Sequence, residues 1–294
     1  MGAPWKGHPA WAVVERAESA LGEPVAPLLL DAGADDLART RNSQLSVLLT
    51  SLMAWDALGP RLAAAPDIEI VAFAGHSLGQ VSALVAAGTL TLDDGIRFAV
   101  RRAELTQAAA DAHPGRMAAL LGATEEQALE ACAAAPDGCW LANDNAPGQI
   151  VLAGTPDGLE TALARAKELG VRRAMPLPVG GAFHTPLMND AVEGLEAALR
   201  DLPLRAPTAP VVSNEDAIAY VDDEGWRERL ARHVIRPVRW GGSMETLASL
   251  GATDFFEVGH GSMIAGVAKR TVPDVAVHGI ASPEAVDTLG GTRS

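Results

Sequence analysis

The sequence predicts an α/β fold in which a large unit with a parallel sheet carries a smaller inserted unit. Two observations support this. An apolar run at 68–74 leads through Gly75-His-Ser-Leu-Gly79 into a helical pattern, which is the strand, turn and helix order of a nucleophile elbow. After His113, short apolar runs and helical stretches follow in the order β-α-β-β-α-β, which is typical of a ferredoxin-like unit. We therefore expect 1–113 and 185–294 to form the large unit and 114–184 the small one.

The elements of the large unit follow from periodicity and from helix-start signals. Thr91-Leu-Asp-Asp resembles a capping box and predicts a helix that begins near Leu92. The alternation of strands and helices predicts a mostly parallel sheet covered on both faces. The Gly-rich tail after Pro283 is expected to be frayed. Helices are expected at 10–21, 43–58, 81–88, 92–110 and 186–202, and strands at 68–74, 209–213 and 254–258.

In the small unit, the pattern is shorter and more regular. Apolar runs predict four strands, and the helical stretches between them predict two helices. The strands are expected at 117–121, 140–143, 150–154 and 174–179, and the helices at 125–134 and 156–169.

Composition excludes several classes of protein. With 294 residues, the chain can form one large domain or a large domain with an insert. Cys132 and Cys139 are too few for a disulfide framework or a structural zinc site, so we expect no metal and two reduced, buried thiols. A net charge of −14 argues against nucleic-acid binding. Because the sequence shows no secretion signal and no apolar stretch of about 20 residues, we expect a cytoplasmic protein without membrane contact.

Ser77 is the candidate nucleophile. An elbow turn is too tight for side chains at its flanks, which predicts that Gly75 and Gly79 are both required. The turn leaves the Ser77 hydroxyl exposed at the start of a helix, where it can form an ester by acyl transfer.

A serine hydroxyl needs a base that accepts its proton, and His184 has the most suitable setting. It precedes Thr185 and Pro186, which suit an N-cap and a first helical residue, so the positive end of a helix would favour the neutral ring. A histidine that only caps the loop is an equally good interpretation of this pattern. His76 adjoins Ser77 and is expected to point away from the hydroxyl. No Asp or Glu presents itself as a third catalytic residue, and a backbone carbonyl stays open for that role.

Arg101 and Arg102 lie on the helix expected at 92–110. Adjacent helical residues project about 100° apart, so at most one of the two can point into a pocket. A buried arginine would hold a carboxylate through two parallel hydrogen bonds. The pattern alone favours two surface arginines.

Several spaced motifs together resemble the malonyl-CoA:acyl carrier protein transacylases and the acyltransferase domains of polyketide synthases. They span nearly the whole chain, and the resemblance implies an α/β-hydrolase-like large subdomain with a ferredoxin-like insert. The motifs are Thr40-Arg-Asn-Ser-Gln44, Gly75-His-Ser-Leu-Gly-Gln80, Arg102, Ala142-Asn-Asp-Asn-Ala-Pro-Gly-Gln149, Ala182-Phe-His184, Pro237-Val-Arg-Trp240 and Glu257-Val-Gly-His-Gly261.

The resemblance implies an acyltransferase that moves malonyl from malonyl-CoA to Ser77 and then to the phosphopantetheine thiol of an acyl carrier protein, in fatty acid or polyketide biosynthesis. It makes His184 the base, oriented by the backbone carbonyl of His233, and makes the Leu78 N–H an oxyanion donor. Arg102 would pair with the malonyl carboxylate. Other positions that match the substrate site are Phe183, Gln44, Asn143, Asn145 and His76.

The resemblance also bears on specificity and partners. Phe183 would fill the space that a methyl branch needs, which implies a preference for malonyl of roughly 10- to 200-fold. No metal or redox cofactor is implied, and we expect a monomer. An acidic carrier protein would need a basic patch, and the densest cluster of arginines is Arg227, Arg229, Arg232, Arg236 and Arg239.

The chain departs from the family at three places. Gln80 stands where the fatty-acid enzymes more often carry Glu, and His233 stands where an amide is common. The family also begins with a strand and a Gly-Gln-Gly-Ser-Gln loop that supplies a second oxyanion donor, and the start at Met1 resembles the stretch after this loop. We therefore expect the first strand to be missing and the true start to lie upstream of Met1.

Two alternative functions stay open. An acyl-thioester hydrolase could use Ser77 and His184 to strip acyl groups from carrier proteins, although Arg102 argues against it. A catalytically weakened protein that lacks part of its oxyanion hole could instead only bind the carrier protein.

Overall fold

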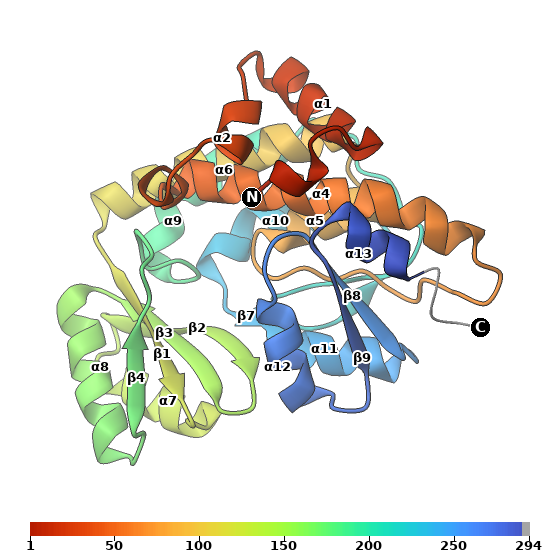
Figure 1. Cartoon of the computed structure of the whole chain (residues 1–294). Coiled ribbons are helices and arrows are strands. Elements are labelled where there is room, and N and C mark those ends of the chain that lie inside the picture. The colour runs from red at the N-terminus through yellow and green to blue at the C-terminus, as the bar shows by residue number, and fades with distance from the viewer. Residues whose placement is uncertain (290–294) are drawn as a thin grey trace.

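The structure is a computed structural model, and it describes residues 1–289. In Figure 1 long helices cross the upper half of the molecule, and two lobes that contain the strands lie below them, at the lower left and the lower right. The helices outside these lobes are α1 (Ala12–Leu21), α2 (Ala26–Leu30), α3 (Ala34–Leu37), α4 (Thr40–Ala64), α5 (Gly79–Ala86), α6 (Leu92–Ala112), α9 (Asn189–Leu199), α10 (Trp226–Arg232) and α13 (Pro283–Thr288).

Helix α4 is the centre of the main core. It buries leucines on several sides, which is why it is longer than its periodicity predicts. The expected end at 58 is wrong, because α4 continues through Pro60 to Ala64. Leu58 and Leu62 are both buried on either side of this proline, and their packing holds the last turn in place.

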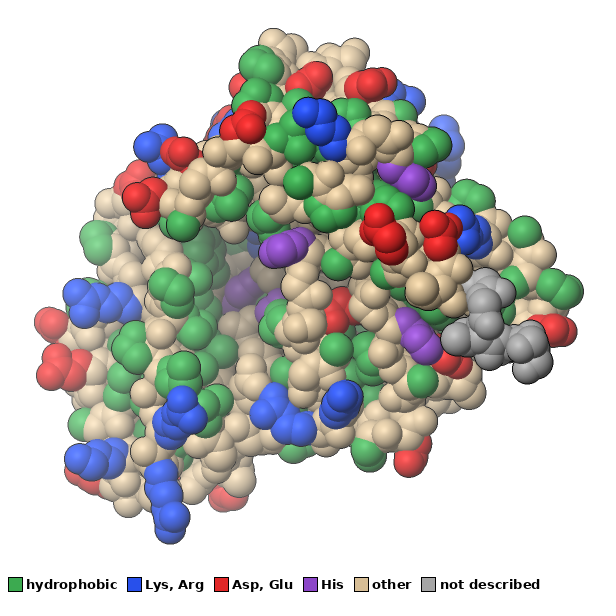
Figure 2. Space-filling model, viewed as in Figure 1, with side chains coloured by type: hydrophobic (Ala, Val, Ile, Leu, Met, Phe, Trp, Pro, Cys, Tyr) green, Lys and Arg blue, Asp and Glu red, His purple; other side chains and the backbone are tan. Residues whose placement is uncertain are grey.

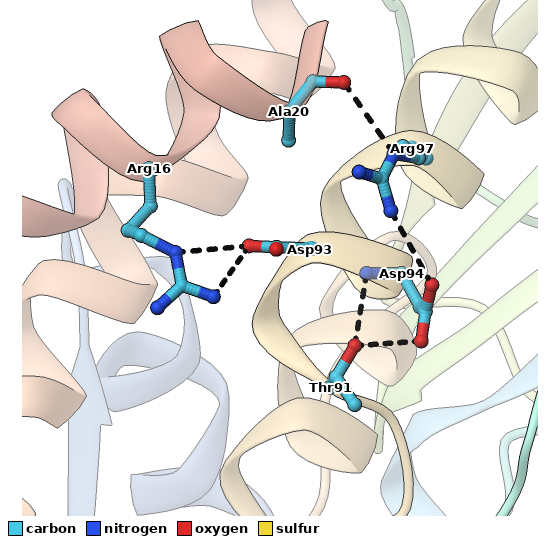
Figure 3. Close-up of polar contacts among 6 residues, drawn as sticks. All are labelled: Arg16, Ala20, Thr91, Asp93, Asp94 and Arg97. Atoms are coloured by element: carbon cyan, nitrogen blue, oxygen red, sulfur yellow. Dashed lines mark hydrogen bonds and ion pairs between the residues drawn. The ribbon is translucent and has the colours of Figure 1, made fainter.

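Helix α1 is attached to the start of α6, as Figure 3 shows. The Arg16 guanidinium donates to Oδ1 of Asp93 at 2.9 Å, and Nε of Arg97 donates to the carbonyl of Ala20 at 3.4 Å. Thr91 caps α6, because its Oγ1 accepts from the backbone N–H of Asp94 at 3.2 Å. Such a cap contributes about 1 kcal/mol, whereas the exposed ion pair contributes less. The predicted start of this helix at Leu92 is confirmed.

The small lobe, at the lower left of Figure 1, has the predicted element order. Its strands pair antiparallel in the order β4-β1-β3-β2, and a short strand from later in the chain, β7, adds parallel to β2. Alternate residues of β1 face opposite sides of the sheet and belong to two separate hydrophobic clusters. Leu120 packs against α7 and α8, and Met117 belongs to the cluster on the opposite face. Cys132 and Cys139 are buried and unbridged in this lobe, as expected. Its elements are β1 (Arg116–Leu121), α7 (Glu125–Ala133), β2 (Cys139–Ala146), β3 (Gln149–Gly154), α8 (Pro156–Glu168), β4 (Arg173–Pro176) and β7 (Val238–Arg239).

The large unit does not contain the single parallel sheet that the sequence predicts. The segment at 68–74 is extended, but within the described part of the chain it pairs only through Phe73, which forms one parallel bridge to Val211. The expected strand and the continuous sheet are therefore wrong for residues 1–289, because no strand lies on the other side of this segment or beside the free edge of β8. The remaining elements are β5 (Val211–Val212), β6 (Ala219–Tyr220), α11 (Trp240–Ser249), β8 (Asp254–Val258), α12 (Met263–Thr271) and β9 (Ala276–Ile280).

A cavity of about 440 Å³ separates the two pieces of sheet. The segment at 67–75 lines one wall and β8 lines another, with Trp55 of α4 and Met244 of α11 between them. Residues 71–74 and all of β8 stay half-exposed, although central parallel strands are normally buried on both faces. The cavity extends to His76 and Leu78, directly beside the elbow.

The C-terminal region differs from the frayed tail that composition predicts. Helix α13 begins at Pro283, and Val286 is buried in the main core. The rest of the predicted tail, 290–294, lies outside the described residues. No helix in the described part of the chain has both the length and the apolar character that a bilayer crossing requires.

Candidate active site

The elbow is built as its sequence predicts, except at one glycine. Ser77 has a φ of 51°, in the left-handed region that costs a non-glycine residue about 1–2 kcal/mol. A Cβ on Gly75 would lie 1.9 Å from the carbonyl oxygen of Gly79, so Gly75 has to be glycine. At Gly79 an added Cβ would meet no atom within 4 Å. The prediction that both flanks are too tight is therefore wrong for Gly79, because that Cβ position faces open space at the start of α5.

His184 lies beside the serine. Its Nε2 atom is 2.8 Å from Oγ of Ser77, and its Nδ1 atom lies 2.9 Å from the carbonyl oxygen of His233 and 3.1 Å from that of Arg236. Because Nδ1 faces two carbonyl oxygens, it carries the proton, and Nε2 presents its lone pair to the serine. Backbone carbonyls thus hold the ring at the place where other sites use a carboxylate.

The backbone around His184 is also fixed. Its φ is 63°, and its N–H donates to the carbonyl of Val234 at 2.9 Å. Thr185 caps the next turn, as predicted, by accepting from the N–H of Leu187. That turn is the 3-10 segment Pro186–Met188, and α9 follows it directly at Asn189, so the helical run expected from Pro186 begins as a 3-10 turn.

Burial is the main reason why the His184 ring is neutral. Desolvation lowers the pKa of His184 to about 3, and the positive charge of Arg102 acts in the same direction. The imidazole therefore stays uncharged at neutral pH and can accept the proton of Ser77.

Arg102 is buried in the site, whereas Arg101 is not. Arg102 donates to Oε1 of Gln44 at 2.6 Å and to Oγ of Ser77 at 3.2 Å, and its side chain is only 4% exposed. Burial lowers the pKa of Arg102 to about 10, so it keeps its positive charge at neutral pH. Arg101 faces solvent beside Glu104. The pattern-based expectation of two surface arginines is wrong for Arg102, because the loop of His184 and helix α4 cover that side of α6.

His76 and Asn145 form a second polar pair near the elbow. Nε2 of His76 lies 2.8 Å from Oδ1 of Asn145, and the His76 ring packs edge-on against Trp240. Burial lowers the pKa of His76, so this ring is also neutral. His76 therefore bonds to Asn145 and not to Ser77, as expected.

The other predicted positions are buried or half-buried. Asn143 is buried on β2 opposite Val238, and Phe183 packs against both the main core and the small lobe. The His233 ring is tilted against that of His184, 5.0 Å away, and burial holds its pKa well below the usual value. Within residues 1–289, the buried Nε2 atom of His233 has no hydrogen-bond partner.

The Leu78 N–H is the free donor at the elbow. It precedes the first residue of α5, and no hydrogen bond to it is formed among residues 1–289. The neighbouring Ser77 N–H is not free, because it donates to Oδ1 of Asn214 at 2.8 Å. One backbone N–H at the positive end of α5 therefore stays available to a negatively charged group.

Asn214 is a residue of the site that sequence reasoning missed. It is 1% exposed and bonds to both sides of the serine turn. A signal was available, since Asn214 follows the apolar run at 209–213, and polar residues at strand ends often lie at functional sites.

The basic cluster expected for docking is not one free patch. Arg232, Arg236 and Arg239 form ion pairs with Glu228, Glu215 and Glu125. The other two are also occupied: Arg227 donates to the carbonyls of Leu199 and Leu202, and Arg229 stacks on the ring of Tyr220. Figure 2 shows instead a hollow between the small lobe and the rest of this face, with histidine side chains on its floor.

Comparisons with known proteins point in one direction. The family model for the acyl transferase domain matches residues 8–289. The malonyl CoA-acyl carrier protein transacylase of Escherichia coli (strain K12) is 34% identical over 272 residues, which are 92% of this chain and 87% of that protein. The solved acyl-carrier-protein S-malonyltransferase of Bartonella henselae has a TM-score of 0.89 and 34% identity, covering 95% of this chain and 90% of that one. A type II polyketide malonyl-transacylase in complex with its acyl-carrier protein has a TM-score of 0.91 and 29% identity, covering 98% and 93%.

Proposed function

The chain belongs to the malonyl-CoA:acyl carrier protein transacylase family, and on this premise we propose that it transfers malonyl from malonyl-CoA to an acyl carrier protein through an ester on Ser77. One observation supports the role of Ser77 most strongly. Its hydroxyl lies between a neutral histidine at 2.8 Å and a buried arginine at 3.2 Å. The histidine activates the hydroxyl, and the arginine selects an acyl group that carries a negative charge.

In the first half-reaction, Oγ of Ser77 attacks the thioester carbonyl and its proton passes to Nε2 of His184. The Leu78 N–H stabilises the oxyanion of the tetrahedral intermediate. When the intermediate collapses, the carbon–sulfur bond breaks, the coenzyme A thiol leaves with the proton from His184, and malonyl stays on Ser77. The carbonyls of His233 and Arg236 stabilise the imidazolium that exists in between.

The second half-reaction runs the same chemistry in reverse. His184 takes the proton from the phosphopantetheine thiol of the carrier protein, and the sulfur attacks the ester carbonyl. The ester bond breaks, and Oγ of Ser77 recovers the proton from His184. The same base and the same Leu78 N–H would serve both steps.

The substrate preference rests on Arg102 and Phe183. The guanidinium of Arg102 lies within 3.2 Å of the serine oxygen, so the carboxylate of a three-carbon acyl group on Ser77 can reach it. Gln44 holds the other side of this guanidinium and keeps its plane fixed. Phe183, which precedes His184 in the chain, would border the same space and would oppose a branched acyl chain. Asn143, Asn145 and His76 shape the wall on the small-lobe side.

We also infer that the cavity beside the elbow is the place of a further strand. It lies between the edge of the 67–75 segment and the free edge of β8, and each of these is paired on one side only. With a strand there, the large unit would have the continuous parallel sheet of an α/β-hydrolase-like subdomain, and the loop after it could supply a second oxyanion donor. The ferredoxin-like description of the small lobe, and the boundaries 1–113, 114–184 and 185–294, are part of the same proposal. Cytoplasmic location and a monomeric state stay predictions from the sequence.

The two alternative functions are less well supported. A hydrolase for neutral acyl chains has no use for the buried charge of Arg102, whose desolvation is costly. A protein that only binds the carrier would not need a serine and a base aligned at 2.8 Å. The fate of the acyl-enzyme distinguishes the three functions. A transacylase passes the acyl group to a thiol, a hydrolase passes it to water, and a protein that only binds the carrier forms no acyl-enzyme.

The experiment is a two-step transfer that is monitored by intact-protein mass spectrometry. The protein is loaded with malonyl-CoA, separated from coenzyme A, and mixed with holo acyl carrier protein. We expect malonyl to leave Ser77 and to reach the carrier protein faster than it is lost to water. Release of free malonate without transfer would support the hydrolase instead.

A further inference from the structure

The parallel ladder of backbone hydrogen bonds between the segment before the elbow and strand β5 stops at the elbow turn. Upstream of the turn, Phe73 N–H donates to Pro210 O, and Val212 N–H donates to Phe73 O, both at 2.8 Å, as in a regular parallel ladder. The next pair of bonds in such a ladder would join Gly75 N–H to Val212 O and Asn214 N–H to Gly75 O. Neither of these bonds is formed among the described residues.

Two side-chain amides take these positions. Nδ2 of Asn214 donates to Gly75 O at 2.9 Å, and Nε2 of Gln80 donates to Val212 O at 3.2 Å. The backbone N–H of Asn214 donates to Oε1 of Gln80 at 2.9 Å, so the Gln80 amide is also bonded to the backbone of Asn214. Both side chains are nearly fully buried, at 1% and 3% exposure. Three of the four backbone groups that the turn releases from the ladder, Gly75 O, Val212 O and Asn214 N–H, are thereby satisfied.

The side-chain oxygen of Asn214 is hydrogen-bonded to the backbone of the nucleophile. Oδ1 of Asn214 accepts from Ser77 N–H at 2.8 Å, while Nδ2 of the same amide holds Gly75 O. One planar group therefore bridges both sides of the turn that places Ser77 at a φ of 51°. It also occupies the Ser77 N–H and leaves the Leu78 N–H as the free donor.

We propose that Asn214, supported by Gln80, is a positioning residue that holds Ser77 in its reactive conformation and leaves the Leu78 N–H to the oxyanion. The inference rests on Ser77 as the nucleophile of the proposed function. It requires that both halves of the Asn214 amide act: the oxygen as acceptor from Ser77 and the nitrogen as donor to Gly75.

The test compares Asn214→Asp with Asn214→Ala and with the parent protein. Asp has the shape of Asn and keeps the acceptor for Ser77 N–H, but its ionised form cannot donate to Gly75 O. The protonated carboxyl can donate. The reactivity of Ser77 in Asn214→Asp should therefore be low at neutral pH and rise as the pH falls, whereas that of the parent does not rise.

Reactivity is measured with diisopropyl fluorophosphate, which does not depend on the malonyl site. Oγ of Ser77 attacks phosphorus, the phosphorus–fluorine bond breaks, fluoride leaves, and His184 takes the proton. The kcat and KM for malonyl-CoA are measured in parallel. If the parent reacts with the probe but not with malonyl-CoA, the proposed function fails, and the inference about Asn214 is still decided by the probe.

We expect Asn214→Ala to lower the labelling rate and kcat by on the order of 10²-fold with little change in KM, because the nucleophile and not the substrate is displaced. Gln80→Met should have a smaller effect, since Asn214 keeps its two bonds to the turn. Ser82→Ala is the control: it removes a buried hydroxyl of α5 that has no hydrogen-bond partner within residues 1–289, and it should leave both rates unchanged.

Two results would overturn the proposal. One is a labelling rate of Asn214→Ala equal to that of the parent. The other is an Asn214→Asp protein that is folded by circular dichroism and has the same reduced rate at every pH, because the donor to Gly75 would then be irrelevant. If Asn214→Ala does not fold, Asn214→Asp decides alone.

Discussion

His184 and Ser77 are joined by a contact of 2.8 Å between Nε2 and Oγ, and the other nitrogen of the ring is held by backbone carbonyls and not by an acid. The orientation of the base therefore depends on the backbone at 233–236 and not on an ionisable partner. The ring is therefore held in place although its pKa is very low. Its protonation state is set by burial and by the charge of Arg102.

The first prediction concerns the pH dependence of acylation. Only the neutral ring can act as base, and the pKa of His184 is lowered to about 3, so the active form persists well below pH 6. We expect kcat/KM for malonyl-CoA to stay level between pH 8 and pH 5. A histidine with a usual pKa of about 6.5 would instead lose roughly 30-fold at pH 5. An acid limb centred near 6.5 in stopped-flow acylation would contradict the assigned state of His184.

The second prediction concerns the charge in the pocket. Arg102→Ala should reduce the preference for malonyl-CoA over acetyl-CoA by on the order of 10- to 100-fold, because hydrogen bonds to a charged carboxylate are lost. The rate with acetyl-CoA should change less. Arg101→Ala is the matched control, since its side chain lies one residue away and faces solvent beside Glu104. Unchanged selectivity in Arg102→Ala, measured by competition between the two thioesters, would remove Arg102 from the carboxylate role.

The third prediction separates the two elbow glycines. Gly75→Ala should destabilise the protein by about 3 kcal/mol or more, since the new Cβ would lie 1.9 Å from the Gly79 carbonyl oxygen. Gly79→Ala should change the free energy of unfolding by less than about 1 kcal/mol, because the site is open and alanine favours the start of α5. Urea unfolding of both variants measures the difference. Equal effects at the two positions would show that the turn has another shape.

The fourth prediction concerns stability against acid. In the unfolded chain His184 binds a proton below about pH 6.5, whereas in the folded protein it does so only near pH 3. The unfolded state therefore binds more protons in this window, and the free energy of unfolding falls as the pH falls. From pH 7 to pH 5, His184 alone should account for a loss of about 2 kcal/mol, and the lowered pKa values of His76 and His233 act in the same direction.

Urea unfolding at pH 7 and pH 5 checks this loss. The fall should be smaller in His184→Asn, which removes the titrating group. A free energy of unfolding that does not change between these two pH values would show that the three rings take up protons in the folded protein as readily as in the unfolded chain.

Much of the site could be predicted from the sequence because its signals are local. Gly75-His-Ser-Leu-Gly79 defines the elbow, and Ala182-Phe-His184 lies before a recognisable turn. The burial of Arg102 could not be read from helix periodicity. It depends on which segments cover α6 in three dimensions, and only the resemblance to a family pointed to it.

Several of the missed features are contacts between distant segments. Asn214 meets the elbow across more than a hundred residues, and no local pattern encodes that contact. The strand expected at 68–74 has the right apolar residues, but a strand also needs neighbours, and among residues 1–289 Phe73 bridges only to Val211. Helix α4 passes Pro60 because the burial of Leu58 and Leu62 outweighs the local preference to end there.

The central claim is that Ser77 carries the malonyl group. The most direct measurement is intact-protein mass spectrometry after mixing the protein with malonyl-CoA, with peptide mapping of the adduct and with Ser77→Ala as control. We predict a mass gain of one malonyl group located on Ser77, and none in Ser77→Ala. A folded protein that gains no malonyl, or that gains it equally in Ser77→Ala, would contradict the account.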